Sequence, residues 1–239
     1  GTSRLSKTEM DKARKKKQHE QQHKLWDWLQ ERQDRGQIRG QGYPSEDCLW
    51  LTEGKGTFNQ AYLNVHGQTG LPVTKQKQIE DFIRRNKVDV LHCQEINIDE
   101  DSFSQCNFIT SNFSVLQNNA LNKYGTATLI RNVFTPENVR MDTSGRAIFF
   151  NIENITLGNV YIHSGTDGLS RGARENYCSE TIPQLLMNRK DSGCWGGDLN
   201  CVTRATDCTH NPESKLSPSL TRLINTLNQS DSFRWEHPG

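Results

Sequence analysis

The sequence predicts an α/β fold with mixed β-sheets. Short apolar runs of strand length alternate with segments whose apolar residues lie at helical spacing. A strand–helix–strand order near residue 60 is followed by a tight hairpin near residue 153, and the sequence contains no internal repeat. This combination indicates an α/β chain in which some strands are connected through helices and others through tight turns.

The predicted strands are short apolar runs bounded by polar or glycine-rich segments. The second one ends at Gln94–Glu95, and two later ones join tightly at Glu153–Asn154 as a hairpin. In chain order the strands cover residues 61–65, 88–93, 124–131, 146–152, 155–163 and 193–195.

Helical spacing of apolar residues predicts helices between and after these strands. Residues 74–87 form the first helix, and residues 173–188 form another with a break at Pro183. The last helix opens with Ser217 at the N-cap and a proline at the first helical position. Its apolar face holds Leu220, Leu223, Ile224 and Leu227.

Composition limits the class of protein. Of 239 residues, 33% are hydrophobic and 24% are charged, yet five Trp, five Tyr and nine Phe supply material for a core. No run approaches the ~18 apolar residues of a membrane span, and the first 24 residues lack the apolar stretch of a signal peptide. The seven cysteines form no C-x-x-C pair. We therefore expect an intracellular protein without a membrane span, a disulfide framework or a zinc site.

Charge is distributed unevenly along the chain. The net charge is +1, but residues 1–40 carry eleven Lys or Arg against six Asp or Glu, with a basic cluster at Lys12 and Arg14–Lys17. This segment is either a nucleic-acid-binding arm or nuclear signal, with Lys15 and Lys16 as DNA contacts, or a solvated helix. The predicted organisation is a basic helical arm over 1–36, a linker or irregular entry over 37–58, and one domain over 59–239.

Polar side chains lie at or just past the ends of predicted strands, where α/β sheets collect ligands. Asn64, Glu95, Asp198 and Asn200 hold these positions, and their oxygens suit Mg²⁺ or Mn²⁺ rather than zinc. Gly196–Gly197 predicts a sharp turn that brings Asp198 and Asn200 to one side. In a phosphate-ester hydrolase, Asp198 would bind or activate water and Asn200 would orient it or the phosphate. Alternatively, Asp198 only caps its own backbone.

Several motifs resemble, in order and rough spacing, those of the endonuclease/exonuclease/phosphatase superfamily. Within it the chain looks most like the apurinic/apyrimidinic-endonuclease-like domains of non-LTR (LINE-type) retrotransposons. The resemblance covers residues 61–239. The motifs are Leu63-Asn64-Val65-His66-Gly67, Val90-Leu91-His92-Cys93-Gln94-Glu95, Gly125-Thr126-Ala127, Asn159-Val160-Tyr161, Gly196-Gly197-Asp198-Leu199-Asn200-Cys201-Val202 and Asp231-Ser232-Phe233-Arg234.

The resemblance implies a four-layer α/β sandwich of two mixed sheets, with the site between their edges. It implies that Asn64 and Glu95 lie near the metal and that Tyr161 reaches the scissile phosphate. It further implies that Asp198 acts on the nucleophilic water and that Asn200 orients this water.

The chain departs from the family pattern at two places. His66 stands where the family has Asn or Asp. It either weakens metal binding or only changes a contact made to the side chains that bind the metal. The family's closing Arg-x-Asp strand and Ser-Asp-His segment do not occur in these 239 residues. We expect the C-terminal strands to be missing and residues 1–239 alone to be an incompetent nuclease, through truncation or genuine loss.

The function implied by the resemblance is that of a Mg²⁺-dependent DNA endonuclease of a nuclear retrotransposon protein, whose nick primes reverse transcription. Two other functions stay open. One is a phosphoesterase of the same superfamily that acts on a small phosphate ester, and the other is a non-catalytic binding or assembly module. Candidate phosphate contacts, besides the basic arm, are Arg131, Arg146, Arg171 and Arg174.

Overall fold

The computed structural model describes residues 59–66, 72–96, 106–119, 125–187, 192–210 and 212–232, together with the single residues Phe103 and Arg189. The chain divides into two units, residues 1–47 and 48–239, and the described residues all belong to the second unit. The predicted arm, with Lys15 and Lys16, and the predicted linker lie outside the described residues.

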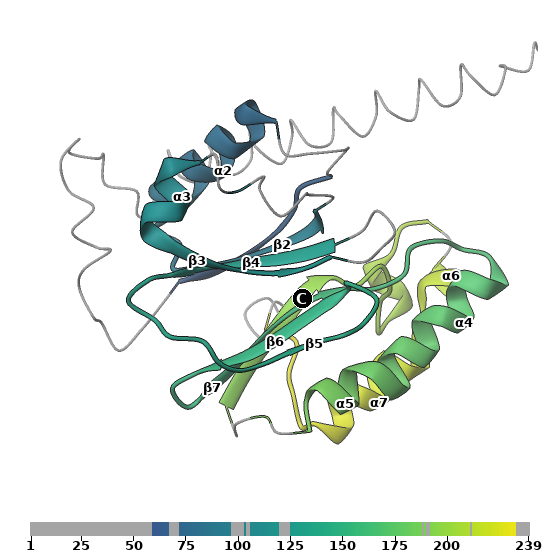
Figure 1. Ribbon diagram of the computed structural model, residues 1–239. Helices are drawn as coiled ribbons and strands as arrows, with labels where there is room; N and C mark the ends of the chain where they lie inside the picture. Colours follow the sequence, from purple (N-terminus) through teal and green to yellow (C-terminus); the bar gives the residue numbers. More distant parts are fainter. Residues whose placement is uncertain are drawn as a thin grey trace, which may run out of the picture. The chain divides into compact units, whose positions relative to one another are not determined.

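Two four-stranded sheets form the centre of the fold (Figure 1). In spatial order, the first sheet contains β1 (Gln60–Asn64), β2 (Val90–Ile96), β4 (Gly125–Arg131) and β3 (Phe113–Asn118). The second contains β5 (Glu137–Met141), β6 (Ala147–Ile152), β7 (Ile155–Tyr161) and β8 (Ser192–Asp198). The β1–β2 and β7–β8 pairs are parallel and the other neighbours are antiparallel. Both sheets are therefore mixed, as predicted.

Helices lie on the outer side of each sheet and complete four layers (Figure 1). The first sheet is covered by α2 (Val73–Asn86) and α3 (Asn107–Asn112). The second is covered by α4 (Gly168–Asn176), the π-helix η2 (Tyr177–Thr181), α5 (Ile182–Leu185) and α7 (Pro218–Thr226). Between β8 and α7 lie the short turns η3 (Ala205–Asp207) and α6 (Pro212–Lys215). No helix among the described residues is long and apolar enough to cross a membrane.

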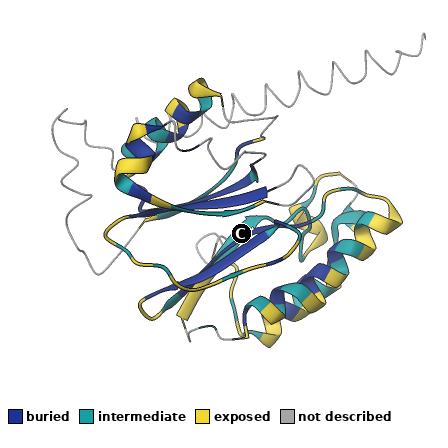
Figure 2. Ribbon diagram, in the orientation of Figure 1, coloured by how far each residue is buried: buried dark blue, intermediate teal, exposed yellow. Residues whose placement is uncertain are grey.

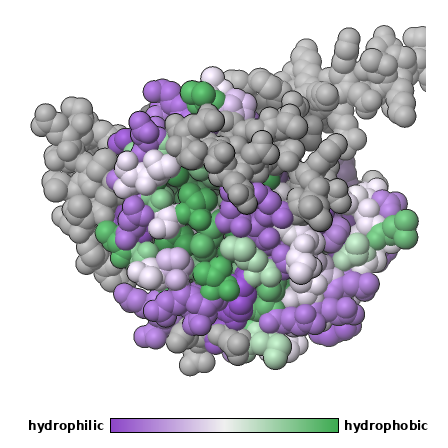
Figure 3. Space-filling model, in the orientation of Figure 1, coloured by the Kyte–Doolittle hydropathy of each residue, from purple (hydrophilic) through white to green (hydrophobic). Residues whose placement is uncertain are grey.

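Three apolar clusters hold the four layers together. Side chains of β6 alternate between two of them: Ile148 and Phe150 face the other sheet, and Phe149 faces the helices of the second sheet. The central strands β2, β4, β6 and β7 are accordingly buried on both faces, as Figure 2 shows in dark blue. Figure 3 shows apolar side chains between the two sheets on one face of the molecule. The cluster between the sheets contains Val90, Ile130, Ile148, Phe150, Ile152 and Leu157.

The structure corrects one predicted helix in two respects. The helix predicted to begin at residue 173 begins at Gly168, because the Asp167 carboxylate accepts a hydrogen bond from the Ser170 backbone N–H at 2.9 Å and caps it. The predicted break does not lie at Pro183, which belongs to α5; the irregular stretch is the π-helix η2, which ends just before α5. By contrast, the predicted N-cap Ser217 is confirmed, since its hydroxyl accepts from the Leu220 N–H at 3.1 Å.

The segment predicted as a glycine turn is strand. Gly196, Gly197 and Asp198 are the last residues of β8 and pair in parallel register with Asn159, Val160 and Tyr161. Gly197 has a φ of +135°, and a Cβ atom there would lie 2.0 Å from the Val160 carbonyl oxygen. The glycine is therefore needed for close approach to β7, rather than for a reversal of the chain.

Replacing Gly197 with alanine is expected to lower the free energy of unfolding by about 1–3 kcal/mol, because β7 and β8 must separate to accept the methyl group. Gly172 in α4 offers a matched control, since a Cβ there meets nothing within 4 Å. G172A should raise stability by about 0.5–1 kcal/mol. Urea unfolding of both variants tests the pair, and equal stability of G197A and wild type would contradict the proposed crowding.

Candidate active site

The predicted site residues meet at one end of the two sheets. Asn64 is the last residue of β1 and Glu95 lies near the end of β2, both in the first sheet. Tyr161 and Asp198 end the paired strands β7 and β8 of the second sheet, and Asn200 follows two residues later. Strands of both sheets therefore supply the predicted site residues.

The backbone at three of these strand ends is left-handed. His66, Glu95 and Asn200 have φ angles of +44°, +56° and +50°, a region that residues other than glycine rarely adopt. Glu95 lies in a β-bulge, because the pairing of β2 with β4 shifts between Gln94 and Ile96. Such strain is concentrated at functional sites, and here it turns the side chain of Glu95 out of the strand's alternation.

Asn64 links the two sheets at the site. Its Nδ2 atom donates to Asp198 Oδ2 at 2.9 Å, and its Oδ1 atom accepts from the His66 backbone N–H at 2.9 Å. Asp198 Oδ1 accepts from the Asn200 backbone N–H at 3.2 Å. Asp198 therefore also caps its own backbone, the alternative role that the sequence allows. Asn200 Nδ2 donates to the Ile162 carbonyl at 3.0 Å. Asp198 and Asn200 are thus held by local and cross-sheet bonds at once.

Glu95 is hydrogen-bonded through both carboxylate oxygens. Its Oε2 atom lies 3.0 Å from His66 Nδ1, and its Oε1 atom accepts from the Tyr161 hydroxyl at 3.2 Å. The His66 contact lowers the pKa of Glu95, and the same contact raises the pKa of His66. Burial, aided by the nearby Glu95, raises the pKa of Tyr161 to about 12. Near neutral pH, Glu95 is therefore an anion and Tyr161 a neutral hydrogen-bond donor.

Three further residues lie near the site and are not among those that the sequence predicts. Lys75, in the first turn of α2, donates to the carbonyls of Val65 and His66, with a distance of 2.9 Å to the latter. Gln94 and Asn159 form a buried amide pair across the two sheets, with Gln94 Nε2 to Asn159 Oδ1 at 2.7 Å. Both amides lie within the motifs named above, but only the fold reveals that they meet.

Two of the four predicted arginine contacts with DNA are buried. Arg131 is 3% exposed, and its Nε atom lies 3.1 Å from Asp89 Oδ1. Arg174 is fully buried and donates to three backbone carbonyls. These positions correct the prediction that the two side chains contact phosphates. Arg146 lies over the Tyr161 ring and Arg171 is exposed on α4.

The predicted metal ligands offer hard oxygen donors. Asn64 and Glu95 lie at adjacent strand ends, and the Glu95 side chain is 22% exposed. No group of three His, Cys, Asp or Glu side chains within the described ranges is arranged to enclose a metal ion. One carboxylate and one amide oxygen nevertheless fit Mg²⁺, which usually keeps waters and substrate phosphates as its other ligands. Protonated His66 would compete with a cation for Glu95.

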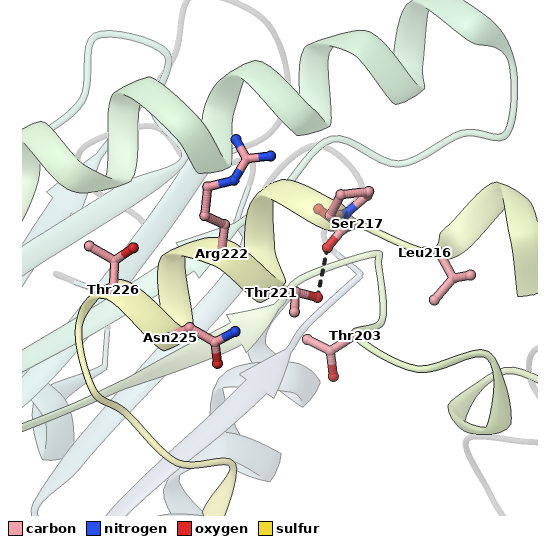
Figure 4. Close-up of a pocket in the computed structure, with 8 residues that line it drawn as sticks. Thr203, Leu216, Ser217, Thr221, Arg222, Asn225 and Thr226 are labelled. Carbon is pink, nitrogen blue, oxygen red and sulfur yellow. Dashed lines mark hydrogen bonds between the residues drawn. The ribbon is translucent and has the colours of Figure 1, made fainter.

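A cavity of about 440 Å³ lies along α7, away from these residues (Figure 4). Thr203, Leu216 and Arg222 line it together with Thr221, whose hydroxyl donates to the Ser217 carbonyl at 3.1 Å. None of the predicted site residues lines this cavity.

Solved structures with the same fold include DNA-processing enzymes. The sequence itself matches no protein-family model and no curated protein. A variant of the 3′ phosphatase NExo from Neisseria, bound to a product DNA hairpin, is 20% identical, covers 77% of this chain and 76% of its own, and has a TM-score of 0.62. The AP endonuclease LMAP from Leishmania major is 18% identical over 85% of this chain and 77% of its own, with a TM-score of 0.58. An AP endonuclease from Archaeoglobus fulgidus is 19% identical over 72% and 73%, with a TM-score of 0.57.

Proposed function

We propose that the chain is the Mg²⁺-dependent endonuclease domain of a non-LTR retrotransposon-type nuclear protein that nicks DNA by phosphodiester hydrolysis. One observation carries the proposal: the five predicted residues converge from two sheets on one hydrogen-bonded cluster, in which His66 joins Asn64 to Glu95. They are Asn64, Glu95, Tyr161, Asp198 and Asn200. The similar folds of an AP endonuclease and of a 3′ phosphatase bound to a DNA hairpin support DNA as the substrate class.

The residues of the cluster divide the work of hydrolysis. Asp198 takes a proton from the attacking water, and Asn200, fixed by Ile162 and Asp198, orients this water. Tyr161 is protonated near neutral pH. Its hydroxyl, which donates to Glu95 in the structure, donates instead to a phosphate oxygen when the substrate binds. Bound Mg²⁺, held by Glu95 and Asn64, would neutralise charge that builds up on the phosphate. Exposed Arg171 contacts the DNA backbone.

The departing group requires a further acid, which we assign to the family's Ser-Asp-His segment. Residues 1–239 contain no such tripeptide. The test therefore compares two proteins, residues 1–239 and a chain extended through that segment. Conversion of supercoiled plasmid to the nicked form in Mg²⁺, blocked by a chelator, is expected for the longer chain. Absence of nicking by both, or nicking unaffected by chelation, would refute the proposal. Release of phosphate from a small ester without nicking would favour the phosphoesterase alternative.

Metal binding provides a test that does not depend on turnover. We expect Glu95→Ala to weaken Mg²⁺ or Mn²⁺ binding by at least ~10-fold, about 1.4 kcal/mol, because the proposed site loses its carboxylate ligand. Calorimetric titration measures the change, and Glu213→Ala, on the exposed surface of α6, serves as the control. Identical affinities in E95A and E213A would rule out Glu95 as a ligand.

A further inference from the structure

Arg146 is the cross-strand neighbour of Tyr161. In the β6–β7 pair Ala147 lies opposite Val160, and the ladder continues with the Tyr161 N–H donating to the Arg146 carbonyl at 2.7 Å. The two side chains therefore lie on the same face of the second sheet. The Arg146 guanidinium carbon lies 5.0 Å from the centre of the Tyr161 ring. Its Nη1 atom also donates to the Tyr161 carbonyl at 3.3 Å, so backbone and ring are both contacted.

The backbone of Arg146 is itself fixed by a buried carboxylate. Asp142, 9% exposed, precedes the tight turn between β5 and β6. Its Oδ1 atom accepts from the Arg146 and Ala147 N–H groups, both at 2.7 Å. Asn118 of β3, in the first sheet, donates to the same oxygen at 3.0 Å and to the Asp142 carbonyl at 2.9 Å. Asp142 thus connects the start of β6 to the first sheet, and it fixes the backbone from which the Arg146 side chain extends to Tyr161.

At its far end Tyr161 contacts the proposed metal ligand Glu95 through its hydroxyl. A continuous series of contacts therefore runs from Asp142 through Arg146 and Tyr161 to Glu95. A ring with a cation over its face and a carboxylate bonded to its hydroxyl has little freedom to tilt. Precise placement of such a group matters because small displacements of reacting or orienting groups reduce rates strongly.

We propose that Arg146 is a positioning residue that acts through Tyr161, holding the phenol ring in the orientation from which its hydroxyl serves the phosphate. The inference rests on the proposed endonuclease function. It differs from direct phosphate binding by Arg146, because the guanidinium is engaged with the ring and carbonyl of Tyr161.

Steady-state nicking by the extended chain tests this role. R146Q is expected to lower kcat about 10-fold with little change in KM, and R146K, which keeps the charge but not the planar guanidinium, should restore part of the loss. R222Q, which removes an exposed arginine on α7, is the charge-matched control and should leave both parameters unchanged. In the Y161F background, R146Q should cause no further loss. A rise in KM instead, or additive losses in the double variant, would overturn the proposal.

A second measurement is independent of activity. The chain has five tyrosines, so ¹³C labelling of tyrosine rings gives a simple spectrum in which the Tyr161 signal is assigned by its loss in Y161F. Ring order measured by relaxation should fall in R146Q and be retained in R222Q. If the wild type fails to nick, the proposed function is wrong and ring order alone decides the role of Arg146. Unchanged order of the Tyr161 ring in R146Q would refute that role.

Discussion

Replacing Asp198 with alanine in the extended chain is expected to lower the rate of plasmid nicking by ~10²-fold or more, the usual loss when a positioned acid–base group is removed. Asp198 contacts Asn64 through one oxygen and the Asn200 backbone through the other, so its loss also releases Asn200, which we propose orients the water. The rate at saturating Mg²⁺ is the quantity to measure.

A control separates chemistry from folding. Asp207→Ala removes an exposed aspartate from η3, nine residues farther along the chain, and should retain nearly full activity. Far-ultraviolet circular dichroism of D198A should match the wild type, because Asp198 is only partly buried. Full activity in D198A would assign the proton transfer to another group and overturn the mechanism. Robust nicking by residues 1–239 alone would point to His66 or His163, the histidines nearest in sequence to the proposed site residues, as the missing acid.

Replacing Arg174 with methionine is expected to lower the free energy of unfolding by about 3 kcal/mol. The guanidinium is fully buried and donates to the carbonyls of His163, Gly165 and Ser214 at 3.4, 2.8 and 2.7 Å. Methionine fills much of the same volume but leaves these acceptors without a donor. The three carbonyls belong to the loop after β7 and to α6, so the loss affects the segments that flank the site.

Arg171 provides the matched control for that change. It lies three residues earlier on the same helix, α4, and is exposed, so R171M should alter stability by no more than about 0.5 kcal/mol. Urea denaturation of both variants gives the comparison. If R174M is as stable as R171M, the buried hydrogen bonds contribute no net stability.

Local sequence signals predict the strand ends of the site well. Asn64 and Glu95 follow apolar runs, and the strand character of these runs comes from their own residues. The N-cap of α7 is equally local, because the Ser217 hydroxyl bonds to a backbone N–H only three residues away. β5 escapes prediction because it is an edge strand whose residues are largely exposed, which leaves no apolar alternation to detect. The glycines before Asp198 predict a turn because glycine is typical of chain reversals, whereas their role here is close packing on β7.

Long-range contacts cannot be predicted from these patterns. A surface arginine and a buried one look alike in sequence, and only the three carbonyls around Arg174 distinguish it from Arg171. The contact of His66 with Glu95 joins residues 29 positions apart, and that of Asn64 with Asp198 joins residues 134 apart. Such pairs depend on how the two sheets stack, which no local periodicity encodes.

The buried amides Gln94 and Asn159 have a consequence for how this site tolerates change. Asn159 Nδ2 also donates to the carbonyls of Cys93 and Ala127, both at 3.0 Å, so one side chain bonds to two strands of the opposite sheet. Apolar contacts between sheets permit small sliding movements, whereas these directional bonds fix one relative translation. Each sheet supplies part of the cluster. Exchange of the two amides for apolar residues would therefore yield a well-packed protein in which the cluster residues of one sheet are out of alignment with those of the other.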